Sequence, residues 1–556
     1  MFGKNISYKI GLLIYSVLLA FVPLWLLWKT GVVYSGSDMQ FHVNRIAEIA
    51  DAIKHGQFLN ITAIISGNAA GGIVNQFYPY LTLLPAALLK LVIHNNVTAY
   101  YMTLLFYNMA TFLIAYYAFT KLAKNRQVGI WGATLASLSM YRLFSLLGTS
   151  GFGEFISIGL IPLVWLGYVK VVNEKKWATL YIGMTLLAYT HLLSFVMVVA
   201  LLGVITLVRW LLSKQWPVQE TVVFAKAGIA TAVSWLPYLV PYLILTHQNH
   251  ISNPYAALTL ESLKSFTAYL FDYHFARGIG LSIVLANILL LLCWQKISRQ
   301  TKVVWWVGVG LVALASTIFP WAAFTTTAIK VLQFPYRFLV IGSVLLAYTG
   351  GVGVVTLLAD KARLYRIVWQ IVLFGTIIGI SLTSIHNYKQ TVLSQYVTAN
   401  KHTKTLNYAP FASYAVTDAT FDKQTTLPFR TYGAYDYWLQ ETGTDVNFYF
   451  NEHEGVKKLA NVGRTQRYAV KVARNADVEV PTMLYDGISY QVYLDGHQTT
   501  ITKGPHGGIV VHASKGHHRI MIKVVTTLVQ KLMVVIAFVP LGIIVWTNWQ
   551  TKRKVK

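Results

Sequence analysis

Charged residues are scarce in this sequence. Only 12% of its 556 residues are Asp, Glu, Lys or Arg, whereas 55% are hydrophobic. A soluble globular domain carries roughly 25% charged residues, so this chain has too few charges to cover a water-soluble fold of its size. Its apolar residues gather in runs of about 20, the length that crosses a hydrocarbon core of roughly 30 Å. The composition excludes an ordinary soluble protein and predicts a polytopic α-helical membrane protein.

Cysteine is nearly absent. The single residue, Cys293, lies inside an apolar run, which excludes an intramolecular disulfide and a metal site built from cysteines. The 15 histidines are scattered, and the adjacent pair His517 and His518 lacks the spacing of metal ligands. We therefore predict neither a metal-ligand set nor an obligatory cofactor.

Acidic residues are also few, because 20 Asp and Glu stand against 46 Lys and Arg, a net charge of +26. A basic excess can indicate nucleic-acid binding, but the cations here form short clusters between apolar runs. Cytoplasmic loops of membrane proteins carry such clusters. We therefore expect a chain that lies in the lipid bilayer and binds no nucleic acid. The clusters are Lys121, Lys124 and Arg126; Lys175 and Lys176; Arg209 and Lys214; Lys296, Arg299 and Lys302; Lys361, Arg363 and Arg366; and Lys552, Arg553, Lys554 and Lys556.

The topology depends on one ambiguous apolar segment, 77–93, which contains Pro79 and Pro85. If this segment is interfacial or re-entrant, every cationic cluster lies on one side of the membrane, and the positive-inside rule places both termini in the cytoplasm. The first run is too long for a signal peptide and is read as a retained span. The resulting 12 predicted spans are 10–29, 97–120, 128–147, 155–172, 177–191, 193–212, 221–246, 278–295, 303–320, 337–358, 366–385 and 526–548.

The chain is predicted to contain three parts. A transmembrane domain, 1–386, includes a long first outer loop at 30–96; an extracytoplasmic β-rich domain, 387–525, follows; and 526–556 forms the last span and a basic cytoplasmic tail. The β-rich prediction rests on alternating runs such as 490–494, which is followed directly by Asp495-Gly496. Asp-Gly between alternating runs is a strong hairpin signal.

The first outer loop contains the most informative cluster of polar residues. Asp38 follows a Gly-containing turn, and His42 and Arg45 come four and seven residues later, so on a helix all three share one face. A carboxylate, an imidazole and a guanidinium together could hold a phosphate and activate a hydroxyl. The alternative is the solvated charged face of an interfacial helix.

Two more predicted outer loops carry candidate residues. Glu154 lies in the short loop 151–155, with Arg142 expected as its nearby cation, and acidic groups at the end of a span are costly unless solvated or paired. His191 lies at the same level between two closely joined spans. A lone histidine, however, is more often a structural hydrogen-bonding group than a catalytic one.

The segment Gln333-Phe334-Pro335-Tyr336-Arg337 opens another span from the outer side. Arg337 could clamp a phosphate, because a guanidinium matches phosphate with two parallel hydrogen bonds. Alternatively, Arg337 snorkels to the membrane interface.

These segments resemble the GT-C superfamily of membrane glycosyltransferases, which share an acidic residue after the first span, a second one in the next outer loop, and an outer domain. More narrowly, they resemble a bacterial family catalogued as membrane proteins with a 6-pyruvoyl-tetrahydropterin-synthase-related domain, close to the YfhO-like proteins. We set aside pterin chemistry, because the trio of histidine ligands it requires is missing. The matching segments are Gly36-Ser37-Asp38, 41–46, Phe77-Tyr78-Pro79, Gly153-Glu154, Thr190-His191, 333–337 and the hairpin 490–496.

The resemblance implies a GT-C-like fold of about 12 transmembrane helices in the bacterial cytoplasmic membrane. It implies an inverting transferase that moves a sugar from a polyprenyl-phosphate carrier to an envelope acceptor, which would be a glycan, a teichoic acid or a protein. Asp38 would be the general base. Glu154 would position the acceptor or share a divalent cation with Asp38. The substrate-binding residues, several of them around the departing lipid phosphate, would be Arg337, Arg45, His42, His191 and Gln333.

Three alternatives remain open. A flippase or transporter of lipid-linked glycans would carry ionisable residues near the middle of several spans, whereas most spans here have uncharged centres. A glycan polymerase would use the same substrates, and only the early Asp-containing loop favours the GT-C reaction. A non-catalytic envelope scaffold would retain its function in the variant Asp38→Asn.

Overall fold

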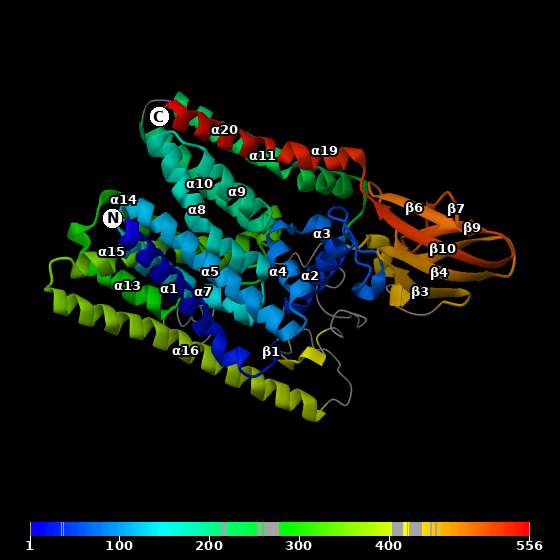
Figure 1. Cartoon of the computed structure of the whole chain (residues 1–556), viewed down its shortest axis with the longest axis horizontal. Coiled ribbons are helices and arrows are strands. Elements are labelled where there is room, and N and C mark those ends of the chain that lie inside the picture. The colour runs from blue at the N-terminus through cyan, green and yellow to red at the C-terminus, as the bar shows by residue number, and fades with distance from the viewer. Residues whose placement is uncertain are drawn as a thin grey trace. The chain divides into compact units, whose positions relative to one another are not determined.

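The structure of the protein is a computed structural model that describes most of the chain. The described residues are 2–34, 36, 38–213, 217–252, 258–260, 277–402, 415–419, 421, 436–444, 447–450 and 453–554. They form two compact units, each assembled from three separate stretches (Figure 1). Unit 1 contains Met1–Met39, Asn95–Thr231 and Tyr255–Asp418, and unit 2 contains Gln40–His94, Ala232–Pro254 and Ala419–Lys556.

Unit 1 is a helical bundle with an apolar core. Helix α15 lies at its centre and packs against α6, α13 and α14. Most residues of α15 are buried, including Leu339, Val344 and Ala347, and their apolar side chains explain why this helix has no polar face. The helices are α1 (Phe2–Trp28), α5 (Asn96–Ala123), α6 (Arg126–Ser137), α7 (Met140–Leu143), α8 (Phe152–Glu174), α9 (Ala178–Ala188), α10 (Leu192–Ser213), α11 (Val218–Gln248, shared with unit 2), α13 (Leu281–Leu292), α14 (Arg299–Leu314), α15 (Leu339–Leu358) and α16 (Arg363–His402).

The prediction of a polytopic helical membrane protein is confirmed. Among the described residues, eight helices are long and apolar enough to cross a membrane, or nine if the pair Arg126–Ser137 and Met140–Gly148, bent by 46°, forms one span. The total of twelve stays a prediction, because α9 and α13 are short and α14 has only 16 residues. The ambiguous segment 77–93 contains a short helix, Leu81–Val92, which is shorter than the roughly 20 residues that a span needs.

Helices α6 and α15 approach each other closely at Gly351. A β-carbon added there would lie 2.6 Å from the backbone nitrogen of Gly132 and 2.9 Å from its Cα. Small residues allow such backbone contact between membrane helices. The contact therefore requires glycine at position 351.

We predict that Gly351→Val lowers the stability of unit 1 by about 1–3 kcal/mol, the usual cost of overpacking. Thermal unfolding of the purified protein in detergent measures the change. The matched control is Gly375→Val on α16, where an added β-carbon meets no described atom within 4 Å. Equal melting of the two variants would show that the α6–α15 contact tolerates a larger side chain.

Unit 2 contains two antiparallel sheets. The five-stranded sheet has the order β3-β4-β10-β6-β7, and the three-stranded sheet has the order β5-β9-β8. Tyr468, Val480, Ile509 and Ile520 belong to the buried cluster that the two sheets enclose. The strands are β3 (Val456–Val462), β4 (Thr465–Val472), β5 (Ala476–Met483), β6 (Ser489–Leu494), β7 (His497–Gln498), β8 (Thr502–Lys503), β9 (Gly508–Ala513) and β10 (Gly516–Val525).

The hairpin expected at Asp495-Gly496 is present. Tyr493 pairs with Gln498, and Leu494 pairs with His497. Both turn residues have positive φ, +52° and +87°, the combination that a tight two-residue hairpin turn requires. The turn that the sequence predicted is therefore confirmed.

The first outer loop contributes helices to unit 2. They are α2 (Met39–Lys54), α3 (Val74–Phe77) and α4 (Leu84–Val92). The C-terminal helices are α19 (Leu528–Ala537) and α20 (Val539–Lys554). Helix α19 runs beside the second half of α11, where Ser234 Oγ donates to the carbonyl of Ala537 at 2.7 Å (Figure 1). The predicted division at 386 and 525 stays a prediction.

Arg464 links helix α2 to the turn between β3 and β4. Its Nη1 lies 2.7 Å from a carboxylate oxygen of Asp51 and 3.4 Å from one of Glu48, and its Nε donates to Gln57 Oε1 at 2.9 Å. The other oxygen of Glu48 accepts from the backbone nitrogen of Ser66 at 2.8 Å. Because these buried charges satisfy one another, part of the first outer loop and the C-terminal strands share one polar network.

Candidate functional site

Glu154 lies at the centre of a polar cluster in unit 1. It lies in the first turn of α8, where an acidic residue is favoured by the helix dipole. One carboxylate oxygen accepts from Arg337 Nε at 2.9 Å, and the other accepts from the Tyr141 hydroxyl at 2.8 Å. The Arg337 and Glu154 side chains are only 15% and 17% exposed, so water screens the pair little.

Arg337 connects Glu154 to the segment before α15. Its Nη1 donates to Gln333 Oε1 at 2.7 Å and to the carbonyl of Leu332 at 2.9 Å. Within the part of the chain that the structure describes, the remaining terminal nitrogen, Nη2, has no hydrogen-bond partner. The structure thus brings three sequence-predicted residues, Glu154, Gln333 and Arg337, into one network, and Arg337 keeps a donor for a ligand.

Asp38 contacts the loop that precedes Glu154. Its backbone nitrogen donates to the carbonyl of Thr149 at 2.9 Å. A β-carbon built on Gly151 would lie 3.7 Å from Asp38 Oδ2, and one built on Gly36 would lie 2.4 Å from the carbonyl carbon of Thr149. Glycine at position 36 therefore lets the chain after α1 lie against the 148–151 backbone. Asp38, which is exposed, consequently lies beside the loop that leads into Glu154.

Arg277 is a member of this region that the sequence did not reveal. Its guanidinium carbon lies 5.0 Å from the ring centre of Tyr336 and 5.8 Å from that of Phe144. Tyr336 directly precedes Arg337, and its ring centre lies 6.1 Å from that of Tyr141. No motif surrounds Arg277 in the sequence, so only the fold identifies it as a second cation here.

The expectation that Arg142 would be the cation beside Glu154 was wrong. Arg142 is fully buried and faces α5, where Nη1 donates to Asn108 Oδ1 at 2.8 Å and Nη2 donates to Thr111 Oγ1 at 3.0 Å. Successive residues of a helix point about 100° apart. Tyr141 rather than Arg142 therefore contacts Glu154.

His191 lies at the start of α10. Its Nδ1 is 2.7 Å from Ser194 Oγ, and the side chain is buried. This contact fits the structural alternative for His191, and its substrate-binding role stays a prediction.

His42 and Arg45 lie in unit 2 and are adjacent, as their helical spacing predicted. Arg45 Nη1 is 3.3 Å from His42 Nδ1, and Nε donates to Asn75 Oδ1 at 3.0 Å. Nη2 donates to the carbonyls of Tyr78 and Pro79 at 2.8 Å and 2.7 Å, and the guanidinium lies 4.3 Å from the Tyr78 ring centre. Arg45 is buried and fixes the 75–79 turn. Its role toward a lipid phosphate stays a prediction.

In the described ranges, no three His, Cys, Asp or Glu side chains are placed so that they could hold a metal ion together.

No protein-family model matches the sequence, and no curated protein matches it. Among solved structures, the chain is similar to ArnT from Cupriavidus metallidurans, whose crystal structure was determined bound to undecaprenyl phosphate. The two chains are 15% identical, the match covers 75% of this chain and 68% of that chain, and the TM-score is 0.35. A similarity this distant assigns neither residues nor an activity, so the function of this chain is inferred from the site itself.

Proposed function

We propose that the protein is a GT-C-type glycosyltransferase with both termini in the cytoplasm. It transfers a sugar from a polyprenyl-phosphate carrier to an envelope acceptor at the outer face of the membrane. The observation that carries the proposal is the position of Asp38 against the loop before α8, whose Glu154 binds Arg337. A positioned base and a cation for developing negative charge are the two groups that this transfer requires.

The residues divide the reaction between them. The Asp38 carboxylate accepts the proton of an acceptor hydroxyl while that oxygen attacks the anomeric carbon of the sugar. The bond between this carbon and the phosphate oxygen breaks, and both of its electrons stay with the departing polyprenyl phosphate. Nη2 of Arg337 donates to this phosphate, and Arg277 adds a second positive charge.

Glu154 acts as a positioning residue in this scheme. Its two oxygens hold Arg337 Nε and the Tyr141 hydroxyl, so the guanidinium is oriented before the donor arrives. Preorganised donors stabilise a transition state without the cost of reorganisation during the reaction. A role of Glu154 in placing the acceptor is compatible with this geometry.

A transfer assay with the purified protein in proteoliposomes tests the function. A panel of polyprenyl-phosphate sugars is offered together with envelope glycan, and both labelled product and released polyprenyl phosphate are measured. We expect one donor to yield equal amounts of the two. Movement of intact donor across the bilayer without any covalent product would instead establish a flippase. Glycan binding without donor consumption would establish a scaffold.

The variant Arg337→Lys tests the phosphate clamp. Lysine keeps the charge but cannot present the planar guanidinium fork, so we expect turnover to fall by roughly 10²-fold, the effect of removing one transition-state donor. Arg363→Lys, at an exposed position of α16, is the control and should retain full turnover. Wild-type turnover of a correctly folded Arg337→Lys protein would exclude Arg337 from the reaction.

A further inference from the structure

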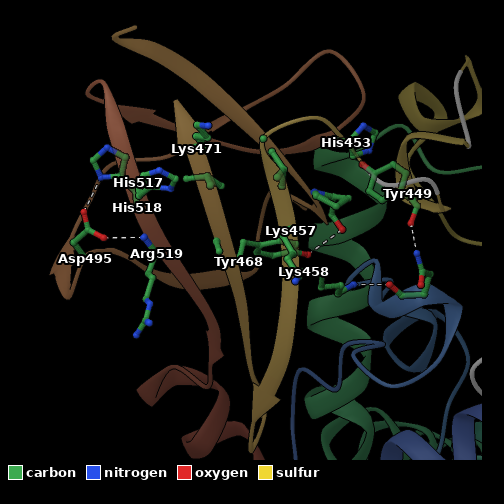
Figure 2. A pocket seen from close by; sticks show the side chains of 16 residues that line it. Tyr449, His453, Lys457, Lys458, Tyr468, Lys471, Asp495, His517, His518 and Arg519 are labelled. Carbon is green, nitrogen blue, oxygen red and sulfur yellow. Dashed lines mark hydrogen bonds and ion pairs between the residues drawn. The ribbon is translucent and has the colours of Figure 1, made fainter. Parts of the chain in front are cut away.

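Unit 2 contains a pocket of about 940 Å³ on its strands. Strands β3, β4 and β10 supply most of its lining, and the side chains of Lys457, Lys471, His517 and Arg519 gather around it (Figure 2). All of the lining residues belong to unit 2. Neither the sequence motifs nor the proposed transfer reaction gives this pocket a role.

The strand register places the cations of the pocket on one face of the sheet. Lys457 and Arg519 both pair with Ala469, and Lys471 pairs with His517 in the neighbouring row. Cross-strand partners, and residues two positions apart, share a face. The small side chain of Ala469 stands between those of Lys457 and Arg519, which leaves a hollow between two positive charges.

The surrounding sheet has no negative charge of its own. Strands β3, β4 and β10 each contain two Lys or Arg residues, and β6 and β7 contain none; no Asp or Glu occurs in any of the five. The acid lining the pocket, Asp495, lies in the hairpin turn, where it binds His518 Nδ1 and the backbone nitrogen of Arg519, both at 2.7 Å. Across the described ranges, no carboxylate pairs with Lys457, Lys471 or Arg519.

A fourth cation lies in the wall of the pocket. Lys458 Nζ donates to the carbonyls of Asn68 and Ala69, at 2.5 Å and 3.0 Å. Burial lowers the pKa of Lys458 to about 8, because a low-dielectric surrounding disfavours the charged form. An anion in the pocket would stabilise the protonated amine and raise this pKa.

The chemistry of the pocket selects among anionic partners. Binding to a lipid surface uses large apolar side chains beside the cations, but among the described residues 456–525 only Val462 is an exposed large hydrophobic residue, and it does not line the pocket. Binding to a single-stranded nucleic acid uses accessible aromatic rings, but Tyr449 and Tyr468 are buried. Of the anionic partners considered, the pocket therefore fits a water-soluble polyanion that is recognised by its charge.

We propose that the pocket between β3, β4 and β10 binds a phosphate-bearing segment of an anionic envelope glycan. Lys457, Lys471 and Arg519 pair with its phosphates, and the guanidinium of Arg519 is suited to two parallel hydrogen bonds with one of them. The proposal concerns binding alone. Its test is therefore independent of the test of the transfer reaction.

The test measures binding of a fluorescent poly(glycerol phosphate) hexamer to the full-length protein in detergent, with maltohexaose as the uncharged probe. In the triple variant Lys457→Gln, Lys471→Gln, Arg519→Gln we expect at least about a tenfold loss of affinity, because each charged hydrogen bond strengthens binding. In the wild type the phosphate probe should raise the pKa of Lys458, measured by trace acetylation across pH. The uncharged probe should leave this pKa unchanged.

The control is a second triple variant, Lys503→Gln, Lys515→Gln, Lys523→Gln, which removes the same number of charges from unit 2 outside the pocket lining. We expect less than about a twofold change in affinity, since charges outside the pocket are screened by salt. Equal losses of affinity in the two triple variants would overturn the proposed binding site, because they would indicate a diffuse effect of charge. Tighter binding to phosphatidylglycerol vesicles or to oligo(dT), or no binding of the hexamer, would also overturn it.

Discussion

We expect Asp38→Asn to lower the rate of the proposed sugar transfer by about 10²- to 10⁴-fold, the range that a general base contributes. The amide has nearly the size of the carboxylate but cannot accept the acceptor's proton. The backbone nitrogen of Asp38 donates to the carbonyl of Thr149, and the substitution keeps this hydrogen bond. The loss should therefore be in kcat, with little change in the KM for the donor. Initial rates in proteoliposomes measure both constants.

A matched control distinguishes this effect from a general loss of negative charge. Asp477→Asn changes an exposed aspartate on β5, and we expect its transfer rate to equal that of the wild type. Thermal melting of both variants verifies folding. Full activity of Asp38→Asn would remove the general base from the proposed mechanism, and the scaffold and flippase alternatives would then be favoured.

Arg464→Met weakens the attachment of helix α2 within unit 2 by about 3–5 kcal/mol, the usual effect of removing one member of a buried ion pair. The Arg464 and Glu48 side chains are only 4% and 2% exposed. Methionine fills similar space but leaves the Glu48 and Asp51 carboxylates without their cation. Amide hydrogen exchange of α2 measures the change directly, because it reports the free energy of local opening.

The pH dependence of this defect has a defined sign. Burial raises the pKa of Glu48, and the Arg464 guanidinium opposes that rise. Without Arg464, the pKa of Glu48 in the folded protein rises further above its value in the unfolded chain. The folded form then binds the extra proton, so the destabilisation shrinks as the pH falls and grows as the pH rises.

Arg467→Met is the control for this experiment. Arg467 lies on β4, three residues after Arg464, but is more exposed. Its Nε donates to the carbonyl of Ala460 at 3.0 Å. A surface change of this kind should alter stability by less than about 0.5 kcal/mol. If the two arginine variants had equal effects on α2, the buried network would not be what attaches this helix.

Hydrophobic length was the reliable signal in the sequence. The predicted span 97–120 corresponds to α5, Asn96–Ala123, because a run of apolar residues that fits a bilayer also favours a helix. The same signal did not locate the end of α16, which continues to His402, well beyond the apolar run 366–385. Hydrophobicity predicts which segment can lie in the membrane, but it does not predict the residue at which the helix ends.

The polar site was only partly predictable, because its partners are distant in the sequence. Glu154 and Arg337 were each chosen from a local motif, yet 183 residues separate them, and nothing local predicts their hydrogen bond. Arg277 has no motif at all. The choice of Tyr141 over its neighbour Arg142 depends on helix phase, which an apolar segment without a polar face does not reveal.

The Arg464 network can form only late in the synthesis of the chain. Arg464 follows Glu48 by 416 residues, and chain synthesis at about 5–20 residues per second takes roughly 20–80 s to cover that length. Throughout this interval Glu48 and Asp51 lack their Arg464 partner, so the buried network that attaches α2 cannot form until the last strands are made. Unit 2 is therefore among the last parts of the chain to fold, although its first helix is made near the start.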